Sequence, residues 1–129
     1  MHLLTLILAI IAVESGGNDL AIGDNGKAYG CLQIHACYVQ DASEYANRPW
    51  EHRDAFDRQV AIQIFTAYMD RYATAKRLGE PVTAEHIARI HNGGPNGHRK
   101  VATEKYWLKV KAVLESHGYD TSVHIQPKQ

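Results

Sequence analysis

The N-terminal part of the sequence is an apolar segment that ends in a carboxylate. Thr5 is the only polar residue between positions 3 and 13, and apolar residues fall on every side at a 3.6-residue spacing. This pattern predicts a helix that is buried all round and is the most buried helix of the fold. Glu14 follows directly. We expect Gly16 and Gly17 to end the helix, because glycine readily adopts the left-handed conformation found there.

Four later stretches have helical spacing of apolar residues. They are residues 36–45, 54–78, 83–91 and 101–116. The longest, 54–78, is predicted to end at Gly79, and Pro81 enforces the stop. Thr83 is expected to cap the next helix, whose first turn contains Glu85 and His86. The connection 92–97 is rich in glycine and proline, so no regular structure is expected there.

A short hairpin is predicted between the first helix and the helix at 36–45. The run Gly23-Asp24-Asn25-Gly26 is a strong turn signal, and residues 21–22 and 28–32 can form its two arms. Gly30 inside the second arm indicates a close approach of another backbone. The expected fold is therefore mainly α with a small hairpin, in one domain over residues 1–118, followed by a polar tail at 119–129.

Composition narrows the possible functions. The 129 residues are 45% hydrophobic, and 14 basic residues balance 14 acidic ones, so charge gives no argument for a nucleic-acid partner. Cys31 and Cys37 do not form a zinc-type pair, and we expect both to be free, although a disulfide between them is an alternative. His86 and His91 are five residues apart, which does not suit two ligands on one helical face, so neither a metal nor another cofactor is expected.

The N-terminal apolar segment also resembles the hydrophobic core of a signal peptide. No basic residues precede it, no small-residue cleavage motif follows cleanly, and it is too short to span a bilayer. We therefore interpret it as structural. An export signal could have preceded the sequence.

Glu14 is the first candidate for chemistry. It is placed at the negative end of a helix dipole in apolar surroundings, and both effects favour the protonated acid that a general acid requires. The alternative is a glutamate that simply reaches solvent. A second carboxylate, ionised at the same pH, is available from Asp24 at the turn or from Asp19 closer to Glu14; Asp24 could also serve the turn alone.

Two further features suit sugar recognition. The connection 92–97 exposes backbone groups that can bind hydroxyl and N-acetyl groups, although it can also be a helix cap and linker. Tyr106 and Trp107, together with His91, offer flat rings for stacking, but helical spacing of this kind is more often found in a core.

The order of these motifs resembles the invertebrate-type (destabilase) lysozymes over residues 8–110. The resemblance is carried by Val13-Glu14-Ser15-Gly16, by Asp24 with Gly26, by residues 30–34 and 68–73, and by the specific string at 88–97, Ala-Arg-Ile-His-Asn-Gly-Gly-Pro-Asn-Gly. It implies a lysozyme-like, mainly helical fold and cleavage of the MurNAc–GlcNAc bond of peptidoglycan by a monomer outside the cytoplasm. The enzyme would need no cofactor and no membrane span.

The resemblance also assigns roles to single residues. Glu14 corresponds to the proton donor and Asp24 to the second carboxylate. The predicted substrate-contacting residues are Gln33, Tyr68, His91, Asn92 and Gly93.

Two departures from the family pattern stand out. The chain lacks the disulfides of animal members, which suggests a bacterial or phage source, and residues 26–29 replace the family's Gly-Ser-x-Ser, so no isopeptidase activity is expected. The alternatives to a muramidase are a lytic transglycosylase that uses Glu14 alone and a non-catalytic peptidoglycan-binding module.

Overall fold

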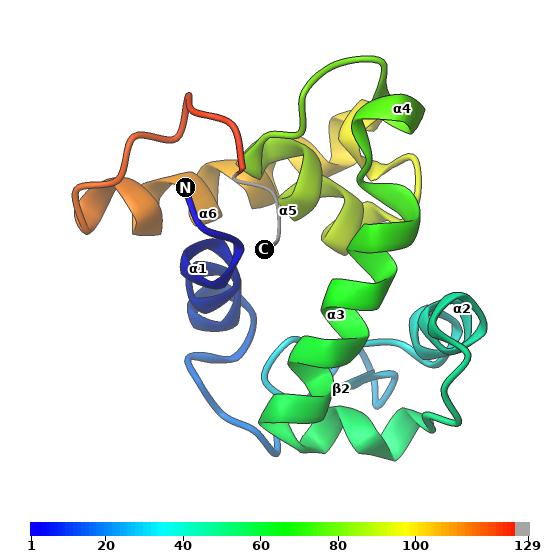
Figure 1. Cartoon of the computed structure of the whole chain (residues 1–129). Coiled ribbons are helices and arrows are strands. Elements are labelled where there is room, and N and C mark those ends of the chain that lie inside the picture. Colours follow the sequence, from blue (N-terminus) through cyan, green and yellow to red (C-terminus); the bar gives the residue numbers. More distant parts are fainter. Residues whose placement is uncertain (126–129) are drawn as a thin grey trace. The chain divides into compact units, whose positions relative to one another are not determined.

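The structure is a computed structural model that describes residues 1–125 (Figure 1). Its helices are α1 (Leu3–Ser15), α2 (Ala36–Ala46), α3 (Arg58–Tyr72), α4 (Ala75–Leu78), α5 (Ala84–Gly93) and α6 (Glu104–Ser116), with 3-10 turns η1 (His52–Phe56), η2 (Gly97–Arg99) and η3 (Val101–Thr103). Strands β1 (Ile22–Gly23) and β2 (Ala28–Tyr29) pair antiparallel, with Ile22 opposite Tyr29. The predicted fold class, mainly α with a small hairpin, is confirmed.

The chain forms two compact units. The central unit contains residues 14–71, and the terminal unit contains residues 1–13 together with the described residues from 72 onward. In the central unit, η1 contacts both β2 and α2, and the core includes Ile34, Tyr38, Ile64 and Phe65. In the terminal unit, α5 contacts α6, η2 and η3, and its buried residues include Ile87, Ile90, Trp107 and Leu114.

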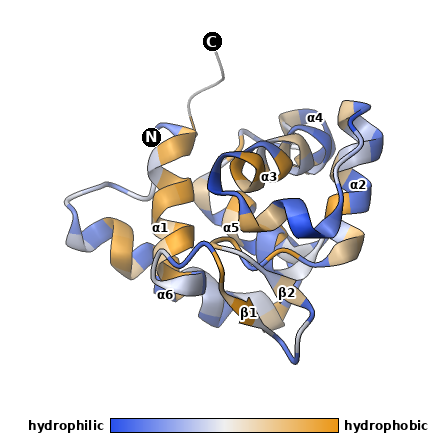
Figure 2. Ribbon diagram, turned by 90° about the horizontal axis from the view of Figure 1, so that it is seen from below, coloured by the Kyte–Doolittle hydropathy of each residue, from blue (hydrophilic) through white to orange (hydrophobic). Residues whose placement is uncertain are grey.

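Helix α1 forms as predicted but is not buried all round. Figure 2 colours most of this helix as hydrophobic, and Leu6 and Ile10 are fully buried. Leu4 and Leu8 are more than half exposed, at 56% and 52%. A helix with apolar residues on every side carries no pattern that shows which side will be covered, so the prediction of complete burial was wrong. No helix within residues 1–125 is long and apolar enough to cross a membrane.

The predicted helix at 54–78 is divided into η1, α3 and α4. Asp57 is extended, and its Oδ1 accepts a hydrogen bond from the amide of Val60, 3.2 Å away. Thr74 is also extended, and its hydroxyl accepts from the amide of Arg77 at 3.2 Å. Short polar side chains that cap a new helix compete with continuation of the old one, and an apolar repeat does not reveal this. The end of α4 at Gly79, which is left-handed, agrees with prediction.

The later helices follow the sequence closely. Thr83 caps α5, since its hydroxyl accepts from the His86 amide while the His86 ring accepts from the Thr83 amide. Part of the predicted tail is paired: Thr83 and His124 form a β-bridge, and the amide of Ile125 donates to Val82 O at 3.0 Å. Residues 126–129 of that tail lie outside the described part of the chain.

Candidate active site

The chain leaves α1 along a path that side chains hold in place. Glu14 lies in the last turn of α1, and Gly17 follows with a left-handed φ of 91°. The Ser15 hydroxyl donates to Cys31 O at 2.8 Å and accepts from the Gly17 amide at 3.2 Å. Arg58 Nη2 donates to Gly17 O at 2.6 Å. The backbone next to Glu14 is thus tied to two other parts of the central unit.

Glu14 lies near a buried tyrosine pair. The rings of Tyr38 and Tyr68 stack with centroids 3.7 Å apart and planes 7° from parallel. Burial, the neighbouring Tyr68 and the negative charge of Glu14 together raise the pKa of Tyr38 well above its usual value. The structure therefore brings Glu14 and Tyr68 into one neighbourhood through Tyr38. Only 3% of Tyr68 is exposed, so its ring packs in the core against Tyr38.

Asp24 lies at the tip of the hairpin, where the backbone has an uncommon conformation. Asp24, Asn25 and Gly26 all have positive φ, at 49°, 55° and 86°. The Asp24 side chain is 57% exposed, and its Oδ2 lies 3.1 Å from His35 Nε2. The turn therefore presents a solvent-accessible carboxylate with one titratable neighbour.

Asp19 is placed differently. Its Oδ1 accepts a hydrogen bond from Arg58 Nε at 2.8 Å, and this bond raises the pKa of Arg58. Because Arg58 also binds Gly17 O, the Asp19–Arg58 ion pair serves the path that leaves α1. Of the two candidate carboxylates, Asp19 is the one already paired with an arginine.

Gln33 supports the hairpin from inside. Its backbone is left-handed, with φ 52°, and its Nε2 donates to Gly30 O at 3.0 Å and to Ala21 O at 3.3 Å. A Cβ on Gly23 would overlap the Gln33 amide oxygen. The side-chain amide therefore joins both arms beneath the turn that carries Asp24.

An aromatic stack that no sequence motif predicted braces the same hairpin. Tyr29 stacks on His52 at 3.6 Å and on Phe56 at 4.6 Å, and His52 Nε2 lies 2.8 Å from Ile34 O. The close approach predicted at Gly30 is confirmed, since a Cβ there would collide with Ala55 O. His35 and His52 were missed because the chain turns that bring them to the hairpin leave no periodic signal.

The predicted sugar-contacting residues His91, Asn92 and Gly93 belong to the terminal unit. Helix α5 includes all three, so the expectation of irregular structure from residue 92 was wrong by two residues. Asn92 is exposed, whereas His91 is only 8% exposed. Gly93 O accepts a hydrogen bond from Lys100 Nζ at 2.7 Å, which supplies the helix end with a cationic donor.

Arg89 and Thr103 hold the connection after α5. Arg89 donates to Thr103 Oγ1, Glu85 Oε2 and Lys100 O at 2.7–2.8 Å, and the Thr103 hydroxyl donates to Gly97 O at 2.6 Å. Arg89, in the string at 88–97, thus fixes the segment that follows α5. Among the aromatic candidates nearby, Trp107 is 8% exposed and lies in the core.

The cysteines are free, as predicted. Cys31 is buried, and burial raises the pKa of its thiol, whereas Cys37 is exposed. Within residues 1–125, no group of three or more His, Cys, Asp or Glu side chains is arranged to hold a metal ion.

Comparisons with known proteins identify the family. The profile of the Destabilase family matches residues 5–113. The chain belongs to the Destabilase family. It is 55% identical over 116 residues to the invertebrate-type lysozyme of Ruditapes philippinarum, and the match covers 87% of this chain and 82% of that protein. It is 36% identical over 103 residues to a lysozyme of Magallana gigas, with coverage of 78% and 72%.

The fold also matches solved structures of this family. An inhibitor-bound lysozyme from Meretrix lusoria superposes with a TM-score of 0.73 at 31% identity, over 90% of this chain and 93% of that one. The expected family and fold are confirmed. The expected bacterial or phage source is not supported, since the similar proteins come from molluscs and from the nematode Caenorhabditis elegans.

Proposed function

We propose that this chain is a muramidase that hydrolyses the β-1,4 bond between MurNAc and GlcNAc in peptidoglycan. Membership of a family whose similar members are lysozymes supports this activity. The observation that carries the proposal is the end of α1. There an apolar helix delivers Glu14 beside a buried tyrosine pair, and Ser15 and Arg58 fix the backbone next to it.

In the proposed mechanism Glu14 is the general acid and Asp24 is the second carboxylate. Glu14 donates its proton to the glycosidic oxygen as the bond to the sugar breaks. The exposed Asp24 carboxyl group acts on the opposite sugar face, either as nucleophile or as the charge that stabilises the oxocarbenium-like state. Water then completes the hydrolysis with retention, and Glu14 accepts its proton. We infer retention from the resemblance to the family, and the standard example of a retaining glycosidase is also a lysozyme.

The other predicted residues receive supporting roles. Gln33 positions the turn that carries Asp24, and Tyr68 packs behind Glu14 through Tyr38. His91, Asn92 and Gly93 are proposed to contact the glycan, with Asn92 the most accessible of the three. The proposed enzyme is a monomer that acts outside the cytoplasm without a cofactor.

Product identification tests the activity. Purified peptidoglycan digested by the enzyme should give muropeptides with reducing MurNAc ends, detected by mass spectrometry before and after borohydride reduction. Products with 1,6-anhydro ends would show a lytic transglycosylase instead. Intact glycan after prolonged incubation with folded protein would show a binding module.

A further inference from the structure

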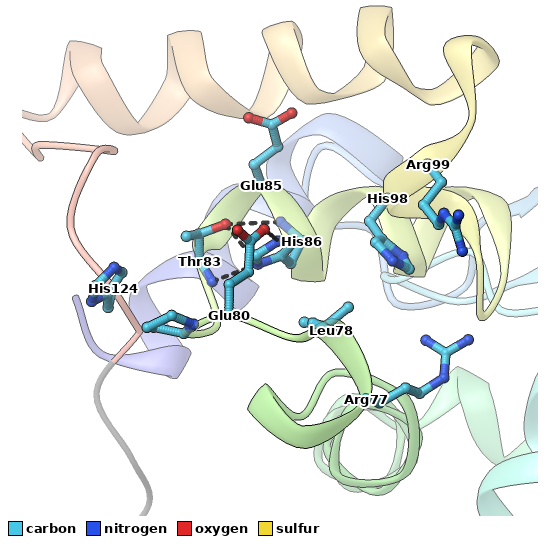
Figure 3. A pocket seen from close by; sticks show the side chains of 10 residues that line it. Arg77, Leu78, Glu80, Thr83, Glu85, His86, His98, Arg99 and His124 are labelled. Atoms are coloured by element: carbon cyan, nitrogen blue, oxygen red, sulfur yellow. Dashed lines mark hydrogen bonds and ion pairs between the residues drawn. The ribbon is translucent and has the colours of Figure 1, made fainter.

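The terminal unit contains a polar pocket that the proposed mechanism does not use. Its volume is about 570 Å³, and it lies where α4, the loop into α5, η2 and the segment around His124 meet. Figure 3 shows Arg77, His98 and Arg99 gathered on one side of the pocket, and Glu80 and Thr83 toward the other. Leu78 provides an apolar surface between them.

Each of the two acidic residues of the pocket already accepts a hydrogen bond from a neighbouring side chain. Glu80 Oε1 lies 2.7 Å from His86 Nε2, and Glu85 Oε2 accepts from Arg89 Nη1 at 2.7 Å. Only Glu85 is paired with a permanently charged side chain, because His86 Nδ1 accepts the hydrogen bond of the Thr83 amide and the ring donates to Glu80 through Nε2.

Neither arginine of the pocket has an acidic partner among the described residues. Arg77 donates to neutral acceptors, namely Tyr72 O at 3.1 Å, Pro95 O at 2.6 Å and Asn96 Oδ1 at 2.9 Å. An arginine has five N–H donors, so Arg77 keeps two after these three bonds. The Arg99 side chain has no hydrogen bond or ion pair to any residue in the range 1–125.

His98 reports the resulting positive potential. Burial lowers its pKa, and the charges of Arg77, His86, Arg99 and Arg89 lower it further. Its Nδ1 is buried without a hydrogen-bond partner in the described part of the chain. The uncompensated charge on this side of the pocket is therefore positive, which favours an anionic ligand.

The residues on the opposite side of the pocket restrict which anionic ligands can bind. Glu80 and Glu85 retain lone pairs that can accept hydrogen bonds from amide or ammonium groups, and they would repel a polyphosphate chain. A ligand with a carboxylate at one end and N–H donors elsewhere satisfies both sides. The volume exceeds the needs of a single inorganic anion.

We propose that this pocket binds a short peptide with a free carboxylate, as carried by the peptide branches of peptidoglycan, through Arg77 and Arg99. The identity of the natural peptide rests on the proposed muramidase function. The guanidinium group of Arg77 is preorganised for binding, because three hydrogen-bond acceptors fix its orientation. The Tyr72 ring adds to this, with its centroid 5.5 Å from the guanidinium carbon.

Binding of a synthetic tripeptide, L-Ala-γ-D-Glu-L-Lys, tests the proposal by calorimetry and by NMR of the histidine rings. The free-acid tripeptide should bind and raise the pKa of His98, because its carboxylate offsets the arginine charges. The form with both carboxylates amidated should bind roughly 10-fold more weakly or worse. Arg99→Gln should weaken binding of the acid by a similar factor, while Arg53→Gln, an exposed arginine of the central unit, should not.

Three results would overturn the proposal: equal binding of acid and amide, wild-type affinity in Arg99→Gln, or inorganic phosphate binding as tightly as the tripeptide. Arg99→Gln is the decisive variant, because Arg77→Gln also removes the three hydrogen bonds that join α4 to Tyr72, Pro95 and Asn96. The measurement involves no turnover, so its failure leaves the muramidase proposal intact. Conversely, a protein that cleaves no glycan can still bind the tripeptide.

Discussion

The hairpin turn at 23–27 and the connection at 92–97 are both rich in glycine and asparagine, but they are held in different ways. The turn has three successive residues with positive φ and leaves Asp24 exposed beside His35. The connection has helical turns at both ends, where Lys100 Nζ donates to Gly93 O and the Thr103 hydroxyl donates to Gly97 O. Similar composition thus yields one loop that presents a reactive group and one that is a fixed part of its unit.

This difference predicts that mutations in the two loops affect different properties of the protein. Changes around the turn should alter activity while the protein stays folded. Changes within the connection should alter stability, because its backbone is packed against α5.

The largest expected effect is the loss of activity in Glu14→Gln, with which the effects of changes in the turn can be compared. Glutamine keeps the shape of the side chain but cannot donate the proton, so wall lysis should fall by about 10²–10⁴-fold. A turbidity assay on purified cell walls measures the loss, and circular dichroism checks the fold. Near wild-type lysis by the folded variant would remove Glu14 from the mechanism.

Next in size is the difference between Asp24→Asn and Asp19→Asn. Asp24→Asn removes the exposed charge of the turn and should reduce lysis on the order of 10²-fold. Asp19→Asn breaks a half-exposed pair with Arg58, so it should cost less than about 1 kcal/mol of stability and little activity. The reverse order of activities would make Asp19 the second carboxylate. If both variants retained lysis, a mechanism with Glu14 alone would be required.

A third comparison tests the connection through Gly97. A Cβ at Gly97 would overlap the carbonyl oxygen and carbonyl carbon of Arg89, and both belong to the backbone of α5. Gly97→Ala should therefore destabilise the protein by about 3 kcal/mol. Gly26→Ala in the turn meets nothing within 4 Å and carries only the cost of a left-handed alanine, about 1 kcal/mol. Urea unfolding of both variants measures the difference, and equal losses would contradict this account of the connection.

The sequence predicted local features better than their surroundings. The hairpin, the Thr83 cap and the stop at Gly79 were correct, because each depends on residues adjacent in the chain. The breaks at Asp57 and Thr74 were missed, since both residues occur inside an apolar repeat that favours one continuous helix. Exposure of Leu4 and Leu8 was missed because it depends on which elements cover α1.

The same limit applies to the candidate site. Glu14 and Asp24 could be proposed from short motifs, but their neighbours could not. Tyr38 beside Glu14 and His35 beside Asp24 come from elements that only tertiary folding brings close. The difference between Asp19 and Asp24 also depends on tertiary structure, because Arg58, which pairs with Asp19, lies 39 residues beyond it in the sequence.

The smallest expected effect is a pH dependence of stability that arises from His98 in η2, directly after the connection. Burial and the nearby arginines lower the pKa of His98 in the folded protein, whereas the unfolded chain binds that proton near pH 6.5. Between the lowered pKa of the folded protein and pH 6.5, the unfolded state binds more protons than the folded state. The stabilisation associated with neutral His98 is therefore complete above pH 6.5, and it is lost as the pH falls from there through the folded pKa. Thermal unfolding between about pH 7.5 and pH 5 should therefore show a smaller decrease in Tm for His98→Gln than for the wild type. His2→Gln, at an exposed N-terminal histidine, should keep the wild-type slope. An unchanged slope in His98→Gln would mean that the surroundings of His98 tolerate a charged imidazole, contrary to the positive potential inferred for the pocket that it lines.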